Sequence, residues 1–450
     1  MKISGTNGFV WLKREITPVQ QAAIHTLGIP GIGFLRENKR VYPTGASVAH
    51  LIGLVNIDNQ GIAGMEKWLD NNGLADLHRA GFATDRLQRP VELSIDLRVE
   101  HALRDELMKA KEKYKAKAAS GLVSNVKTGE IVALVSLPDF DPNNPKEAHD
   151  PDRINRLTTG VFEMGSTFKA LTLAMALDSG KANLNTLYDG RGAMKYGKFT
   201  IHDTHPVGRS ITLSEVFTFS SNVGAAKIAL GQGVEAHKAF LKKLGQLDRL
   251  RTELPESTSP IVPKRWGELN TITIAFGHGM AVAPLQAVMG INAVVNGGYL
   301  IPPTFLKRSE EEARAIGKKV LKTETSDKMR YLMRLNAEIG TAKKADVKGY
   351  YIGGKTGTSE KVVNGRYSKK QVLNSFTAIF PADNPKYQLL IMLDEPKALP
   401  ETHGFITSGW NTVPTGGKVI ARIGPLLGVE PRFDLPTSDR LILAASKTSQ

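Results

Sequence analysis

The chain has 450 residues, and its 59 Lys and Arg against 44 Asp and Glu give a formal net charge of +15. Apolar residues make up 41% and charged residues 23%, which is typical of a water-soluble globular chain and excludes a wholly disordered protein. The absence of cysteine excludes thiol catalysis, disulfides, and cysteine-ligated zinc or iron–sulfur sites.

The sequence carries no membrane or targeting signal of its own. No stretch approaches the roughly 18 consecutive apolar residues of a membrane span, and the first residues lack the apolar core of a secretion signal. The basic residues are dispersed, and the densest run, five alternate lysines within 109–117, includes Glu112. We therefore expect a soluble chain with a solvated basic face and no nucleic-acid partner.

Residues 1–90 are rich in Gly, Pro, Asn and Arg, with short strand-like pieces such as 8–12, which predicts a small loop-rich module. An alternating strand is predicted over 91–95. Apolar residues at four-residue spacing then predict an amphipathic helix over 98–118, followed by two strands joined by a polar turn, 121–123 and 131–135.

The middle of the chain is helical and the last third returns to strands. Helices are predicted over 166–179, 212–220, 223–231, 234–244, 284–296 and 325–338. Strands are predicted over 350–357, 374–381 and 387–393, antiparallel because their connections are short, before a final helix over 416–427. This order predicts one large α+β domain over 91–435 and a polar tail over 436–450.

Ser166 and Lys169 lie three residues apart at the start of a predicted helix. That spacing puts the hydroxyl and the amine on one helix face, and an apolar run follows. The free backbone N–H groups of a first turn favour an oxyanion, and a lysine beside an apolar wall can act as a base at neutral pH. A second copy of the pattern, Ser124 and Lys127, lies in a strand leading to a turn, where alternation separates the two side chains.

Two further patterns carry candidate chemistry. Lys355, Thr356 and Gly357 follow an apolar segment and two glycines, so a strand edge would offer backbone groups and a cation for a carboxylate. Ser220 and Asn222 lie between two predicted helices. They are either residues that merely end helices, or a hydroxyl for proton relay and an amide that binds substrate and the lysine amine.

A phosphate-loop pattern over 349–356 is rejected. It lacks a buried strand before it, and the turn at Asn364 and Gly365 follows instead of a helix. We also expect no metal site, since His202 and His205 lie in a polar loop with no third ligand in the pattern.

In chain order, the patterns at 166–169, 220–222 and 355–357 are the motif set of penicillin-binding proteins and class A β-lactamases. The flanking segments 128–143, 275–286 and 40–66 resemble class B penicillin-binding proteins, and are most similar to the division-specific (septal) transpeptidase of Gram-negative bacteria. The resemblance covers about 9 to 430.

The resemblance implies a penicillin-binding transpeptidase or serine β-lactamase-like domain, with an antiparallel sheet flanked by helices and a helical subdomain. It implies that 1–90 is the remnant of a dimerisation-like N-terminal pedestal, since members usually begin with a membrane helix and a longer module. The implied location is the periplasmic face of the inner membrane, although this chain lacks the anchor. Met164 departs from the proline that members often have there.

The implied activity is that of a peptidoglycan D,D-transpeptidase, which cross-links stem peptides ending in D-Ala-D-Ala through a serine acyl-enzyme in septal wall synthesis. Implied partners are these peptides, β-lactams, and division-complex membrane proteins including a glycosyltransferase; no cofactor is implied. The resemblance assigns the following roles: nucleophile Ser166, general base Lys169, proton relay Ser220, substrate and lysine holder Asn222, positive charge Lys355, substrate-binding residues Thr356, Gly357 and Thr358, and oxyanion donors in the backbone N–H groups of Ser166 and Thr358.

Three alternatives remain open. A D,D-carboxypeptidase or β-lactamase-type hydrolase would resolve the same acyl-enzyme with water. A non-catalytic penicillin-binding scaffold would use the same fold, but the intact motif residues argue against it.

Overall fold

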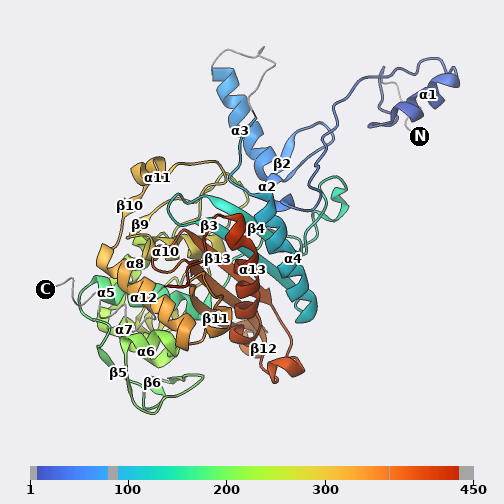
Figure 1. Ribbon diagram of the computed structural model, residues 1–450. Coiled ribbons are helices and arrows are strands. Elements are labelled where there is room, and N and C mark those ends of the chain that lie inside the picture. The colour runs from blue at the N-terminus through green and yellow to red at the C-terminus, as the bar shows by residue number, and fades with distance from the viewer. Residues whose placement is uncertain (1–7, 80–89, 364, 435–450) are drawn as a thin grey trace.

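A computed structural model describes residues 8–79, 90–363 and 365–434 (Figure 1). In this described part, the centre is a five-stranded sheet of order β11-β12-β13-β3-β4, and every neighbouring pair is antiparallel. The strands are β3 (Ala118–Asn125), β4 (Ile131–Leu137), β11 (Gly353–Val363), β12 (Arg366–Phe380) and β13 (Tyr387–Asp394). β3, from the first third of the chain, therefore pairs with β13, from the last third, so that one sheet contains both groups of strands. The domain over 91–435 stays a prediction.

The two faces of the sheet pack against different helices. α4 (Leu97–Lys113) and α13 (Thr412–Leu426) lie together on one face, as Figure 1 shows, over a core that includes Val123 and Ile391. The neighbouring residues Leu122 and Leu390 point to the other face and belong to the core of the helical block. Because successive side chains alternate and both faces are covered, these strands appear in the sequence as continuous apolar runs.

The helical block contains most of the remaining elements. Its helices are α5 (Lys169–Asp178), α6 (Leu213–Thr218), α7 (Asn222–Gln232), α8 (Val234–Lys243), α9 (Glu268–Ile274), α10 (Pro284–Val295) and α12 (Thr323–Ile339), with α11 (Glu310–Ile316) beside them. Its short strands are β5 (Leu187–Asp189), β6 (Met194–Tyr196), β7 (Phe199–Ile201), β8 (Ser210–Thr212), β9 (Tyr299–Leu300) and β10 (Lys318–Lys319). α6 begins with a capping box formed by Thr212 and Glu215.

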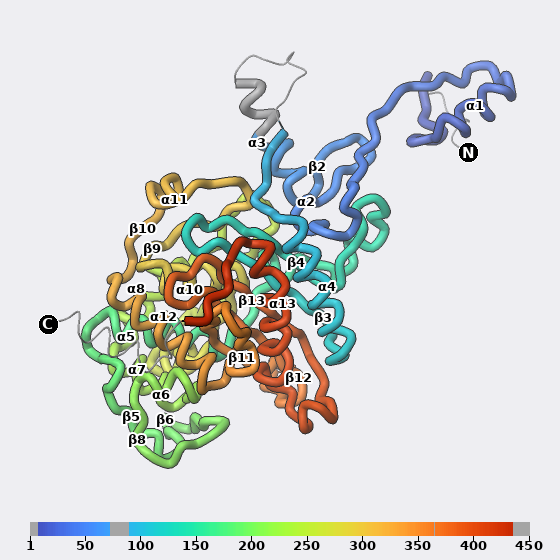
Figure 2. The backbone as a smooth tube through the Cα atoms, in the orientation of Figure 1, coloured from blue at the N-terminus to red at the C-terminus, as the bar shows by residue number. Residues whose placement is uncertain are grey.

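The N-terminal segment begins away from the body of the molecule, as α1 at the blue end of the tube in Figure 2 shows, and its later part lies against the body. Its elements are α1 (Pro18–Thr26), α2 (Ala49–Ile52), β1 (Leu54–Val55), β2 (Gly61–Ala63) and α3 (Gly64–Arg79). Val48, Leu51 and Met65 belong to the same core as Leu134 of β4. The division at residue 90 stays a prediction, and the tail at 436–450 lies outside the described residues.

Several element boundaries differ from the sequence predictions. Neither 8–12 nor 91–95 forms a strand, and of the latter segment Leu93 makes one isolated bridge to Leu306. β11 starts at Gly353 rather than 350, because Tyr351 has a left-handed φ of +47° that a strand cannot accommodate. In the described residues, none of the helices is both long enough and apolar enough to span a bilayer.

Candidate active site

Ser166 lies in a tight turn that leads into a buried helix. The predicted helix over 166–179 is in fact a 3-10 turn, Gly165–Phe168, followed by α5. Nζ of Lys169, the first residue of α5, donates to Oγ of Ser166 at 3.0 Å. Gly165 has a φ of +55°, and a Cβ there would lie about 3.1 Å from the carbonyl oxygen of Thr358. The glycine therefore lets the turn pack directly against β11.

The segment between α6 and α7 lies against the same amine. Nζ of Lys169 donates to the carbonyl oxygen of Ser220 at 2.5 Å and to Oδ1 of Asn222 at 2.7 Å, and it lies 3.2 Å from Oγ of Ser220. Ser220 has a φ of +58°, an uncommon conformation for a residue other than glycine. Such strained backbone is often found at functional sites, and here it turns both polar groups of Ser220 toward Lys169.

Lys355 approaches from β11 on the other side. Its Nζ donates to Oγ of Ser220 at 2.8 Å and contacts the carbonyl oxygen of Thr356 at 3.3 Å. The hydroxyl of Ser220 therefore lies between two lysine amines. The residues of all three sequence motifs come together at one place, although they belong to three separate parts of the chain.

Burial controls the charge of both amines, since both lysine side chains are 0% exposed. Desolvation lowers the pKa of Lys169 well below 10.5, the positive charge of Lys355 lowers it further, and Asp203 acts in the opposite direction. Burial alone lowers the pKa of Lys355 to about 7. The lowered pKa makes it easier for the amine beside Ser166 to give up its own proton, and so to act as a base.

The three residues after Lys355 have different surroundings. Thr356 is 7% exposed, and its hydroxyl pairs with that of Thr341 at 2.8 Å. Gly357 faces the turn that holds Ser166, because a Cβ there would lie 2.7 Å from the carbonyl oxygen of Met164. Thr358 is partly exposed, and its Oγ1 accepts from the backbone N–H of Ser408 at 3.1 Å.

Sequence reasoning did not find four residues around this site. Thr341 and Ser408 support the two threonine hydroxyls, and Asp203 accepts hydrogen bonds from the segment that contains Asn222. Glu163 accepts from the backbone N–H of Gly279 at 2.8 Å and from a tyrosine hydroxyl on β12.

The residues of the second serine–lysine pattern have other partners. Oγ of Ser124 accepts from Asn292 at 3.0 Å, whereas Lys127 forms an ion pair with Glu310. The phosphate-loop pattern places its lysine inside β11, and the strand continues where that motif needs a helix. Within the described ranges, no group of three or more His, Asp or Glu side chains is placed to hold a metal.

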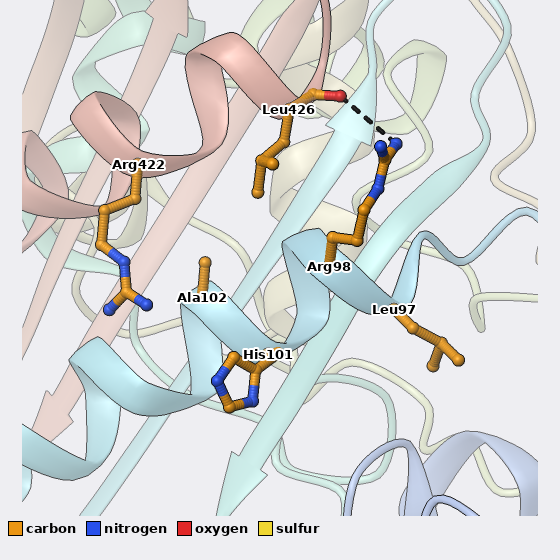
Figure 3. Close-up of a pocket in the computed structure, with 6 residues that line it drawn as sticks. All are labelled: Leu97, Arg98, His101, Ala102, Arg422 and Leu426. Carbon is orange, nitrogen blue, oxygen red and sulfur yellow. Dashed lines mark hydrogen bonds between the residues drawn. The ribbon is translucent and has the colours of Figure 1, made fainter.

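A separate open groove of about 560 Å³ lies between α4 and α13 (Figure 3). Its two guanidinium groups already have partners: Arg98 pairs with Asp96, and Arg422 with Asp105 and Glu106. The groove lies on the sheet face opposite α5, away from Lys169 and Lys355.

Comparisons with known proteins agree with this geometry. Residues 119–408 match the family model of the penicillin-binding protein transpeptidase domain. The chain is 42% identical over 431 residues to the probable peptidoglycan D,D-transpeptidase FtsI of Caulobacter vibrioides, covering 94% of this chain and 72% of that protein. It is 31% identical to the peptidoglycan D,D-transpeptidase FtsI of Escherichia coli, covering 96% and 74%.

The fold has solved relatives as well. The transpeptidase domain of penicillin-binding protein 3 from Burkholderia pseudomallei superposes with a TM-score of 0.67 at 29% identity, covering 77% of this chain and 98% of that one. The predicted fold class is confirmed. The chain therefore belongs to the penicillin-binding protein transpeptidase family, among the class B members related to FtsI.

Proposed function

We propose that the chain is a peptidoglycan D,D-transpeptidase in which Ser166 is the nucleophile and Lys169 its general base. One observation carries the assignment: a fully buried lysine amine, with its pKa lowered, lies 3.0 Å from the serine oxygen. A nucleophile and a base within hydrogen-bond reach are the minimum arrangement for acyl transfer. The family membership supplies the activity class, and the geometry supports these residue roles.

In the acylation step, Oγ of Ser166 transfers its proton to Nζ of Lys169 and bonds to the carbonyl carbon of the penultimate D-Ala. The peptide C–N bond then breaks, and the hydroxyl of Ser220 relays a proton to the leaving D-Ala amine. Asn222 holds Lys169 through its Oδ1 and contacts the substrate. An amine of a second stem peptide then attacks the ester, which releases Ser166 and forms the cross-link.

The substrate's terminal carboxylate binds near β11 in this proposal. Lys355 supplies positive potential, and the partly exposed hydroxyl of Thr358 donates to the carboxylate, with Thr356 beside it. Gly357 keeps the strand close to the nucleophile's turn, so a substrate bound along β11 lies next to Ser166. Backbone N–H groups of Ser166 and Thr358 hold the oxyanion, each worth roughly 3–4 kcal/mol in comparable sites.

We further propose that the enzyme acts in septal wall synthesis at the periplasmic face of the inner membrane, with division-complex membrane proteins, including a glycosyltransferase, as partners. The support is the similarity to two relatives named FtsI. Residues 1–90 act as a pedestal module that holds the catalytic domain away from the membrane.

Mass spectrometry of the intact protein after penicillin exposure tests the catalytic assignment. We expect one β-lactam per chain, mapped by peptide digestion to Ser166 and lost in Ser166→Ala. Ser124→Ala, which alters the second copy of the motif, should keep the adduct. An adduct on Ser124, or no adduct on a folded protein, would overturn the proposal. Product analysis with an amine acceptor then separates transpeptidation from hydrolysis.

A further inference from the structure

Asp203 lies in the loop between β7 and β8, outside every motif found in the sequence. Its carboxylate accepts three hydrogen bonds from the start of α7: Oδ2 from Oγ of Ser221 at 2.6 Å, and Oδ1 from the backbone N–H groups of Asn222 at 2.6 Å and Val223 at 2.9 Å. Ser221 is the N-cap of α7, and its Oγ also accepts from the N–H of Gly224. A single carboxylate thus satisfies two of the N–H groups that a helix start leaves without partners.

The same loop also fixes the side chain of Asn222. Its Nδ2 donates to the carbonyl oxygen of His202 at 3.1 Å. An amide that donates on one side presents its oxygen on the other, and that oxygen accepts from Lys169 at 2.7 Å. His202 and Asp203 therefore hold both the backbone and the amide of Asn222 in the orientation that the lysine needs.

Asp203 also acts on Lys169 through its charge. Groups from several elements surround this amine: Lys355 on β11 lowers its pKa, and Asp203 raises it. His278, which follows α9, also lies near it; burial lowers the pKa of this histidine to about 4, and the charge of Lys169 acts in the same direction. His278 is thus neutral at pH 7. Among these groups, Asp203 alone favours the protonated form of Lys169.

We propose that Asp203 is a positioning residue of the acylation machinery, which orients Asn222 against Lys169 and stabilises the lysine once it has taken the proton of Ser166. The inference deepens the proposed function and rests on it. The carboxylate touches neither substrate nor Ser166, so it acts through Asn222 and through its charge. A displacement of about 1 Å in such a support typically reduces a rate about 10²-fold.

The test compares Asp203→Ala and Asp203→Asn with wild type, using the acylation rate by penicillin as a function of pH. Asp203→Ala removes every hydrogen bond, and we expect a loss of about 10²-fold. Asp203→Asn keeps the shape and part of the bonding but removes the charge. Without that charge Lys169 loses its proton more readily, so the acid limb of the pH profile should move to lower pH.

Asp178→Asn is the matched control. This carboxylate at the end of α5 also accepts two hydrogen bonds, from the backbone N–H of Lys322 and the hydroxyl of Thr325. Asp178 lies nine residues after Lys169 on the same helix. It should leave the acid limb unchanged, since a merely structural carboxylate has no effect on the base.

The outcomes separate the two claims. Wild type that is not acylated on Ser166 overturns the proposed function. If wild type is acylated on Ser166 but the acid limb of the Asp203→Asn profile lies at the wild-type pH, the role of Asp203 is overturned and the proposed function stands. If Asp203→Ala fails to fold, as circular dichroism would show, the Asp203→Asn profile alone decides.

Discussion

Replacing Lys355 with methionine should make the folded protein more stable at pH 7 while removing acylation. The lysine is 0% exposed, and burial lowers its pKa from 10.5 to about 7. That difference, about 3.5 pH units, corresponds to about 5 kcal/mol of unfolding free energy lost at pH 7. Methionine has a similar length and no charge, but it gives up two hydrogen bonds of about 1 kcal/mol each. The net gain is about 3 kcal/mol.

The pH dependence gives this prediction its sign. Between pH 7 and 10.5 the unfolded chain holds a proton that the folded protein does not, so wild-type stability rises with pH by about 1.4 kcal/mol per pH unit. Lys355→Met lacks this slope, so its advantage should shrink to about zero near pH 9. Urea unfolding at pH 7, 8 and 9 measures it, with Lys418→Met, exposed on α13, as the control. An advantage that is constant with pH would refute the reasoning.

Lys169→Ala should slow β-lactam acylation about 10²–10⁴-fold, as loss of a positioned base does; a stopped-flow rate within about threefold of wild type would identify another proton acceptor. Gly277→Ala should remove most acylation, because its φ is +84° and the added methyl would collide with the carbonyl oxygen of Gly165; Gly231→Ala, with nothing within 4 Å, should keep it. A chain beginning at Pro90 should keep measurable acylation but lose solubility, since core side chains would be uncovered; a folded chain without acylation would show that the N-terminal segment completes the site. Calorimetric titration with ATP should show no saturable binding, whose appearance would restore the nucleotide-binding interpretation.

Apolar periodicity located the buried elements but not the exposed ends of strands. β13, predicted over 387–393, runs from Tyr387 to Asp394, because its side chains are buried on both faces of the sheet. β12 begins at Arg366, eight residues before the predicted start, where the mostly exposed residues 366–368 pair with 361–363 of β11. Such pairing is not visible in the pattern of apolar and polar residues along the sequence.

The candidate site was predictable in part. Helical spacing places Ser166 beside Lys169, but their contact with Ser220, 51 residues beyond the lysine, and the contact of Lys355, a further 135 residues on, depend on tertiary structure. Only the family resemblance joined them in advance. The sequence did not predict Asp203 as part of the site, because most of its hydrogen-bond partners are backbone N–H groups, which any sequence provides.

The position of the Ser220 hydroxyl between two amines has a consequence for proton balance. Two positive charges around one oxygen repel each other, so protonating one amine makes the other release its proton more readily. In the proposed mechanism the proton that leaves Ser166 stays within the buried pair and then passes to the amine of the leaving group, so acylation exchanges no net proton with solvent. The acylation rate should then be independent of buffer concentration at fixed pH.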